Sequence, residues 1–123
     1  MQSSSVVLLQ SDPAIVQSLC ADLRHSFRSV KETRSLNELR TSIAKHHPEV
    51  AILDMEMASI SEVGLLAHEF PSVSIVCTHR LADEEMWAAA LRAGAADICP
   101  SQDKRGILTA VMRSASRSQS LAA

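Results

Sequence analysis

In this 123-residue chain, the side chains that could react or bind a ligand come directly after short apolar segments. Asp54 follows Val50-Ala51-Ile52-Leu53, and the other positions of this kind are Gln10-Ser11-Asp12, Thr78-His79 and Pro100-Ser101. A carboxylate and a protonated imidazole that share one pocket form a pairing that depends on pH. We therefore look for function at these positions, with Asp54 and His79 as the first candidates.

Thiols offer a second kind of site. Cys77, His79 and Cys99 fall on two segments that we expect to be neighbouring strands, and alternation along the chain places Cys77 and His79 on one side. A structural metal needs three or four ligands with defined geometry, and the short spacing of zinc ligands is absent. Buried strand cysteines are the simpler interpretation, so we expect no metal centre.

The elements that must position these residues follow from a fivefold alternation of apolar and amphipathic segments. Strands are predicted at 5–9, 29–33, 50–53, 73–78 and 96–99. The helices between them begin at Asp12-Pro13, at Ser35-Leu36-Asn37-Glu38 and at Ser59-Ile60-Ser61-Glu62, and the last two cover 82–93 and 102–116. Such alternation predicts a parallel sheet covered by helices on both faces, with its ligand site at the carboxyl ends of the strands.

Two details complete the predicted elements. Gly94 is expected to end the fourth helix, because glycine adopts the left-handed conformation of a helix terminus. In the last helix we expect four apolar residues to face inward: Ile107, Leu108, Val111 and Met112. The chain is predicted to form one domain over residues 1–118, with a flexible tail at 119–123.

Composition excludes several classes of protein. The formal net charge is −2, the chain has no Tyr and only two Phe and one Trp, so neither a basic surface nor a stacking platform for nucleic acid is expected. No apolar run is long enough to span a membrane, and the first residues lack a secretory pattern. Three cysteines are too few and odd in number for a disulfide framework. We expect a cytoplasmic protein.

Three segments together resemble the receiver domain of two-component response regulators. They are Val6-Val7-Leu8-Leu9 leading to Asp12-Pro13, the run from Pro48 to Asp54, and Ala90-Leu91-Arg92-Ala93-Gly94-Ala95. The resemblance covers residues 5 to about 116. It implies an α/β, flavodoxin-like, doubly wound (βα)5 fold with strand order 2-1-3-4-5 in three layers, and a signalling module that is not an enzyme.

The resemblance also implies a chemistry. In the family, an aspartate at the position of Asp54 is phosphorylated by a histidine kinase. Two acidic residues after the first strand hold Mg²⁺, which prefers carboxylate and phosphate oxygens. A Thr or Ser after the fourth strand and a Lys after the fifth contact the phosphoryl oxygens, and this contact biases the surface of the fourth and fifth helices.

This chain departs from that pattern around Asp54. The acidic positions fall on Gln10 and Ser11, while Asp12 has the place of a helix N-cap. The lysine position falls on Ser101. Because an aspartyl phosphate adds about two negative charges, and these residues supply no compensating cation, we expect weak or lost Mg²⁺ binding and impaired phosphorylation.

Two residues compete for the family's Thr or Ser position after the fourth strand. Counted back from Gly94 without gaps, it falls on His79, with Thr78 one residue early. A shift of one residue in a strand sends a side chain to the opposite face, so Thr78 is a poor expected substitute. Glu56 would add repulsion to the site if it pointed inward.

Three functions therefore stand side by side. The first is an atypical receiver that works through protein contacts, with a histidine kinase or an output domain as partner. This alternative includes a homodimer through the fourth helix, fifth strand and fifth helix, where the expected contact residues are Trp87, Leu91, Arg105 and Arg113. The second is a working phosphoacceptor that uses Asp54. The third is a small-molecule or metal sensor around Asp54, His79 and Cys99.

Overall fold

The computed structural model describes residues 4–122, with side chains described for 4–116. Five strands alternate with five helices along this part of the chain. In order they are β1 (Ser5–Leu9), α1 (Pro13–Leu23), β2 (Ser29–Thr33), α2 (Leu36–His46), β3 (Val50–Asp54), α3 (Ile60–Glu69), β4 (Ser74–His79), α4 (Glu84–Ala93), β5 (Asp97–Pro100) and α5 (Lys104–Ala122).

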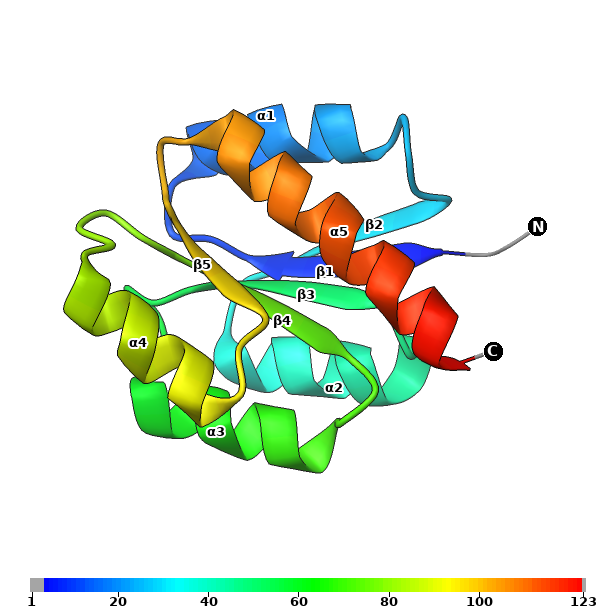
Figure 1. Cartoon of the computed structure of the whole chain (residues 1–123). Helices are drawn as coiled ribbons and strands as arrows, with labels where there is room; N and C mark the ends of the chain where they lie inside the picture. Colours follow the sequence, from blue (N-terminus) through cyan, green and yellow to red (C-terminus); the bar gives the residue numbers. More distant parts are fainter. Residues whose placement is uncertain (1–3, 123) are drawn as a thin grey trace.

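The strands form one parallel sheet in the order β2-β1-β3-β4-β5, which confirms the predicted topology. Helices α1 and α5 cover one face, and α2, α3 and α4 cover the other (Figure 1). Alternate residues of the strands belong to two apolar clusters, one on each face of the sheet. One contains Leu8 and Ile52 beneath α1 and α5, and the other contains Leu53 and Ile75 beneath the remaining helices. Both faces of the sheet are therefore buried, as continuous apolar strands require.

Local signals begin and end the helices. Asp12 Oδ1 accepts a hydrogen bond from the backbone N–H of Ala14 at 2.9 Å, and Pro13 opens α1. Ser59 and Glu62 form the predicted reciprocal capping box of α3. At α2 the box is incomplete: Ser35 caps Glu38, but the Glu38 carboxylate accepts from the N–H of Arg34 instead of Ser35.

Gly94 ends α4 as predicted, with a φ of 117°. A Cβ placed there would lie 2.6 Å from the Cβ of Ala67. The position therefore excludes other residues both by its conformation and by the close approach of α3 to α4.

Helix α5 differs from its prediction in extent and in orientation. It runs from Lys104 to Ala122 rather than over 102–116, because the sequence after residue 116 contains no proline or glycine to end it. Met112 is 46% exposed, so its predicted inward placement is wrong. The small residues Ala110 and Ala115 pack on the sheet instead, which turns the buried stripe away from Met112.

The predicted tail begins inside this helix. Its last residue, Ala123, lies outside the described residues, and the flexibility of 119–123 stays a prediction. Among the described helices, none combines the length and the apolar character that a membrane span needs.

Candidate functional site

The candidate site lies at the carboxyl edge of the sheet, where β1, β3 and β4 end. Asp54 is the last residue of β3 and only 2% exposed. It pairs in register with Thr78 of β4, and Leu9 of β1 pairs with Leu53. Gln10, Asp54 and Thr78 therefore stand in one row across three adjacent strands, on the face that α1 and α5 cover.

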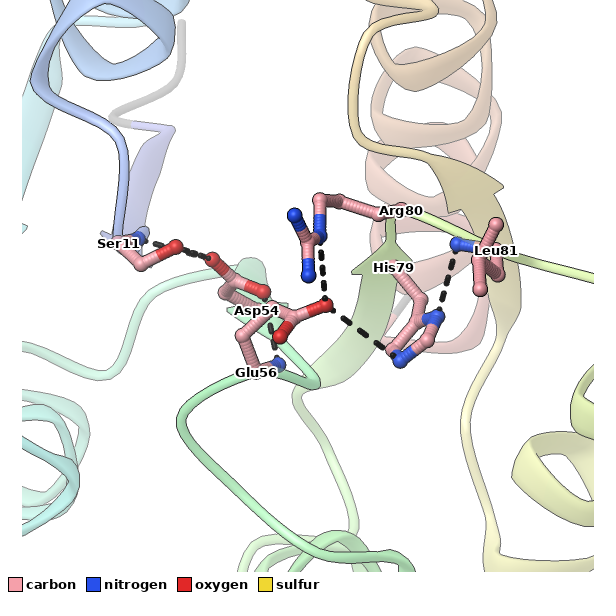
Figure 2. A network of polar contacts seen from close by, with 6 residues as sticks. All are labelled: Ser11, Asp54, Glu56, His79, Arg80 and Leu81. Atoms are coloured by element: carbon pink, nitrogen blue, oxygen red, sulfur yellow. Dashed lines mark hydrogen bonds and ion pairs between the residues drawn. The ribbon is translucent and has the colours of Figure 1, made fainter.

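The carboxylate of Asp54 is held by three donors. Its Oδ2 accepts from the backbone N–H of Ser11 at 2.8 Å and from the Ser11 hydroxyl at 2.6 Å. Its Oδ1 accepts from the backbone N–H of Glu56 at 2.9 Å. Figure 2 shows these contacts closing around the carboxylate from both sides. Charge-assisted bonds of this kind stabilise a buried carboxylate.

Gln10 and Thr78 are joined directly. The Gln10 amide donates from Nε2 to Thr78 Oγ1 at 2.8 Å, and both side chains are buried. The sheet register thus places Thr78, and not His79, beside Asp54, which corrects the count back from Gly94. That count assumed a particular length for the connection between β4 and α4, whereas the ladder of the sheet decides which side chain faces the site.

His79 takes part in a different group of contacts. Its Nε2 lies 3.6 Å from Glu56 Oε2, and its Nδ1 accepts the backbone N–H of Leu81 at 3.0 Å. The bond from Leu81 requires a lone pair on Nδ1, so the ring hydrogen sits on Nε2 and faces Glu56. The expected pairing of His79 with Asp54 is therefore replaced by a pairing with Glu56.

Arg80 is the residue that the sequence did not single out. Its Nε lies 3.4 Å from Glu56 Oε2, and the exposed side chain reaches back over Glu56 toward Asp54 (Figure 2). The Glu56 carboxylate therefore has two partners, the imidazole of His79 and the guanidinium of Arg80. The one sequence signal for Arg80 was its place two residues after the predicted fourth strand.

The remaining residues at or near the expected site make other contacts or none. The Asp12 carboxylate caps the N-terminus of α1. Ser101 is buried, and its hydroxyl has no hydrogen-bond partner among the described residues. Lys104 points to α1, where its Nζ lies 2.9 Å from Asp22 Oδ2 and 2.9 Å from Ser18 Oγ. No lysine therefore takes the place that the resemblance assigns to position 101.

The cysteines do not gather into a ligand set. Cys77 packs in the cluster beneath α2, α3 and α4, and Cys99 packs in the cluster on the opposite face. Burial raises the pKa of the Cys77 thiol to about 12 and that of Cys99 to about 11, so both are uncharged at neutral pH. In the described part of the chain, no three His, Cys, Asp or Glu side chains are placed to hold a metal ion.

Gln10 and Ser11 stand where the resemblance implies acidic ligands for Mg²⁺. A hard cation needs oxygen acceptors directed at it. Where the acidic pair would stand, the Gln10 amide group donates to Thr78 and the Ser11 hydroxyl donates to Asp54.

The expected contact residues lie on α4 and α5. Trp87 on α4 is 49% exposed, and Leu91, one turn further along, is half-buried. Arg105 and Arg113 are exposed on α5. Their exposure leaves them available for a partner.

Comparisons with known proteins identify the fold. No family model and no curated protein matches the sequence. Among solved structures, the signal receiver domain of the response regulator NarL from Mycobacterium tuberculosis is 22% identical, with a TM-score of 0.79, over 94% of this chain and 98% of that one.

Two further structures extend this likeness. The receiver domain of a Bacteroides fragilis response regulator is 19% identical, with a TM-score of 0.82, over 93% of this chain and 98% of that one. A Burkholderia pseudomallei response regulator, solved with a phosphorylated aspartic acid and a calcium ion, is 18% identical over 98% of this chain and 73% of that one, with a TM-score of 0.76. The chain has the flavodoxin-like fold of response-regulator receiver domains.

Proposed function

We propose that this chain is an atypical receiver module of two-component signalling that works through protein contacts, with Mg²⁺-dependent phosphorylation of Asp54 impaired. One observation carries the proposal. The Asp54 carboxylate already accepts three hydrogen bonds, two of them from Ser11 at the position where a metal ligand would stand. To attack a phosphoryl group, an oxygen of Asp54 must give up such hydrogen bonds. This chain has no pair of carboxylates after β1 that would hold a cation in their place.

Charge supports the same proposal. A phosphoryl group on Asp54 would bring about two negative charges to a nearly buried position. Lys104 is engaged with Asp22, and Arg80 with Glu56. The phosphorylated form would therefore lack the fixed cation that offsets its charge.

A specific observation also favours the second candidate, a working phosphoacceptor. Thr78 stands in register with Asp54, and the exposed guanidinium of Arg80 lies beside Glu56, two residues after Asp54. These two groups would be the hydroxyl donor and the cation of an altered phosphorylation site. The experiment below separates the two functions.

The test is incubation of the protein with acetyl phosphate and Mg²⁺, followed by intact-mass measurement. We expect no phosphorylated species for the wild type. The triple variant Gln10→Asp/Ser11→Asp/Ser101→Lys restores the acidic pair and the lysine, and we expect it to gain one phosphoryl group. Asp54→Asn in the triple background is the matched control and should remain unmodified. Efficient wild-type labelling that disappears in Asp54→Asn would establish the phosphoacceptor instead.

We further propose that the contact surface includes Trp87 and Leu91 of α4 with Arg105 and Arg113 of α5, and that a second copy or another signalling protein docks there. Half-exposed Trp side chains are frequent anchors of protein interfaces. Light scattering tests the homodimer: wild type should have a dimer mass that Trp87→Ala reduces to a monomer mass. A monomer mass for both proteins removes the homodimer and leaves a different protein as the partner.

A further inference from the structure

A half-open cavity of about 290 Å³ lies between the N-terminal parts of α1 and α5. Ile15 and Leu19 of α1 and Ile107 of α5 supply its apolar walls, and Ser101 lies in the wall beside β5. Most pockets that hold a small ligand combine such apolar walls with a few polar groups that orient it. An enclosed apolar cavity of roughly 150 Å³ is large enough to bind benzene, so this half-open cavity has room for a substituted ring.

Ser101 supplies the polar group. The residue is 5% exposed, and its hydroxyl has no hydrogen-bond partner among the described residues. A buried hydroxyl without a partner costs about 1–3 kcal/mol. The backbone is anchored, because the N–H of Ser101 donates to the carbonyl oxygen of His79 at 3.0 Å. Rotation about the single Cα–Cβ bond is therefore enough to turn the hydroxyl toward a ligand.

Charge at the mouth of the cavity narrows the ligand class. Lys104 is the one cationic residue of the wall, and its Nζ is already paired with Asp22 Oδ2 at 2.9 Å. An anionic ligand would have to compete with that carboxylate. An uncharged ligand avoids the competition and matches the apolar walls.

We propose that the cavity between α1 and α5 binds a small uncharged molecule that has an apolar ring-sized body and one hydrogen-bonding head group directed at Ser101. The site is separate from the Asp54 carboxylate and its three donors, so it does not depend on whether Asp54 is phosphorylated. Its effect would reach the carboxyl edge of the sheet through the backbone bond between Ser101 and His79.

Phenol and toluene are suitable probes, since they share size and shape and differ in the hydroxyl. Titration of each into isotope-labelled protein, followed by amide resonances, reports both affinity and place. We expect both probes to shift amides of the first turns of α1 and α5, and phenol to bind more tightly. Ser101→Ala should weaken phenol binding by about 3- to 10-fold, the value of one neutral hydrogen bond, and leave toluene binding unchanged.

Two variants control this test. Ser42 on α2 is a second buried serine without a hydrogen-bond partner among the described residues, and it does not line the cavity. Ser42→Ala should therefore leave both probes unaffected. Ala14→Phe, at the exposed mouth, should fill the cavity and abolish binding of both.

Three results would overturn the proposal. The first is that neither probe shifts the amides of α1 and α5. The second is that Ala14→Phe leaves binding intact, which would place the probes elsewhere. The third is that Ser101→Ala affects phenol and toluene equally, which would remove the role of the hydroxyl. Because Ser101→Ala deletes an unpartnered buried group, it should fold at least as stably as the wild type, so loss of structure does not confuse the comparison.

Discussion

Replacement of Asp54 by Asn should destabilise the protein, and the sign of this effect is informative. In the wild type, three donors bond to the two carboxylate oxygens of Asp54. Asparagine has one acceptor oxygen and one NH₂ group in place of the two carboxylate oxygens. At least one hydrogen bond is therefore lost, because the NH₂ group faces a backbone N–H that is also a donor. The remaining bonds lose their charge assistance, about 1 kcal/mol each. An amide is easier to bury than a carboxylate, and this offset leaves a net loss of about 2–4 kcal/mol in the free energy of unfolding.

Urea denaturation followed by far-ultraviolet circular dichroism measures this loss. With a slope of about 2 kcal/mol per molar urea, the midpoint should fall by about 1–2 M. Asp12→Asn is the matched control, because Asp12 is an exposed N-cap and asparagine caps a helix equally well. Its midpoint should remain that of the wild type.

The opposite sign would refute the reasoning. A carboxylate crowded by two acidic neighbours is repelled by them, and its replacement by Asn then relieves strain. If Asp54→Asn had the midpoint of Asp12→Asn or a higher one, Ser11 would not stabilise the carboxylate as the distances indicate. Ser11→Ala provides the second arm of a double-mutant cycle, in which we expect the Ser11 and Asp54 substitutions to be coupled by about 1–2 kcal/mol.

Three further predictions concern the rest of the fold. Gly94→Ala should lower the free energy of unfolding by about 1–3 kcal/mol, because its φ is positive and its Cβ would press on Ala67; thermal unfolding would measure the loss, and an unchanged melting temperature would contradict it. Ser59→Ala should cost about 1 kcal/mol through loss of the α3 cap, measured by urea denaturation. Folded Cys77 and Cys99 keep their protons to a pKa of about 12 and about 11, above the ordinary 9.0. Their contribution to stability is therefore complete below pH 9 and is lost as pH rises toward 12, by about 1.4 kcal/mol per pH unit for the fully buried Cys77 and by less for Cys99. Cys77→Ala should flatten this decline.

Several features of this protein could be read from local sequence. Asp54 follows an apolar strand, Asp12-Pro13 begins a helix, and Gly94 ends one, because each signal depends on a few adjacent residues and the conformations they allow. The order of such elements along the chain then restricts the connections of a parallel sheet to few arrangements. Fold and location of the site were therefore within reach of the sequence.

Which side chains meet at the site was decided by the tertiary structure. The register between β3 and β4 places Thr78 rather than His79 beside Asp54, and the turn after β1 brings both donors of Ser11 to one carboxylate oxygen. Packing also exposed Met112, which helical periodicity alone had placed inward. Sequence patterns describe neighbours along the chain, whereas strand register and helix rotation are set by contacts between segments far apart in it. Only the assembled sheet therefore shows that the Asp54 carboxylate accepts hydrogen bonds from Ser11 and Glu56.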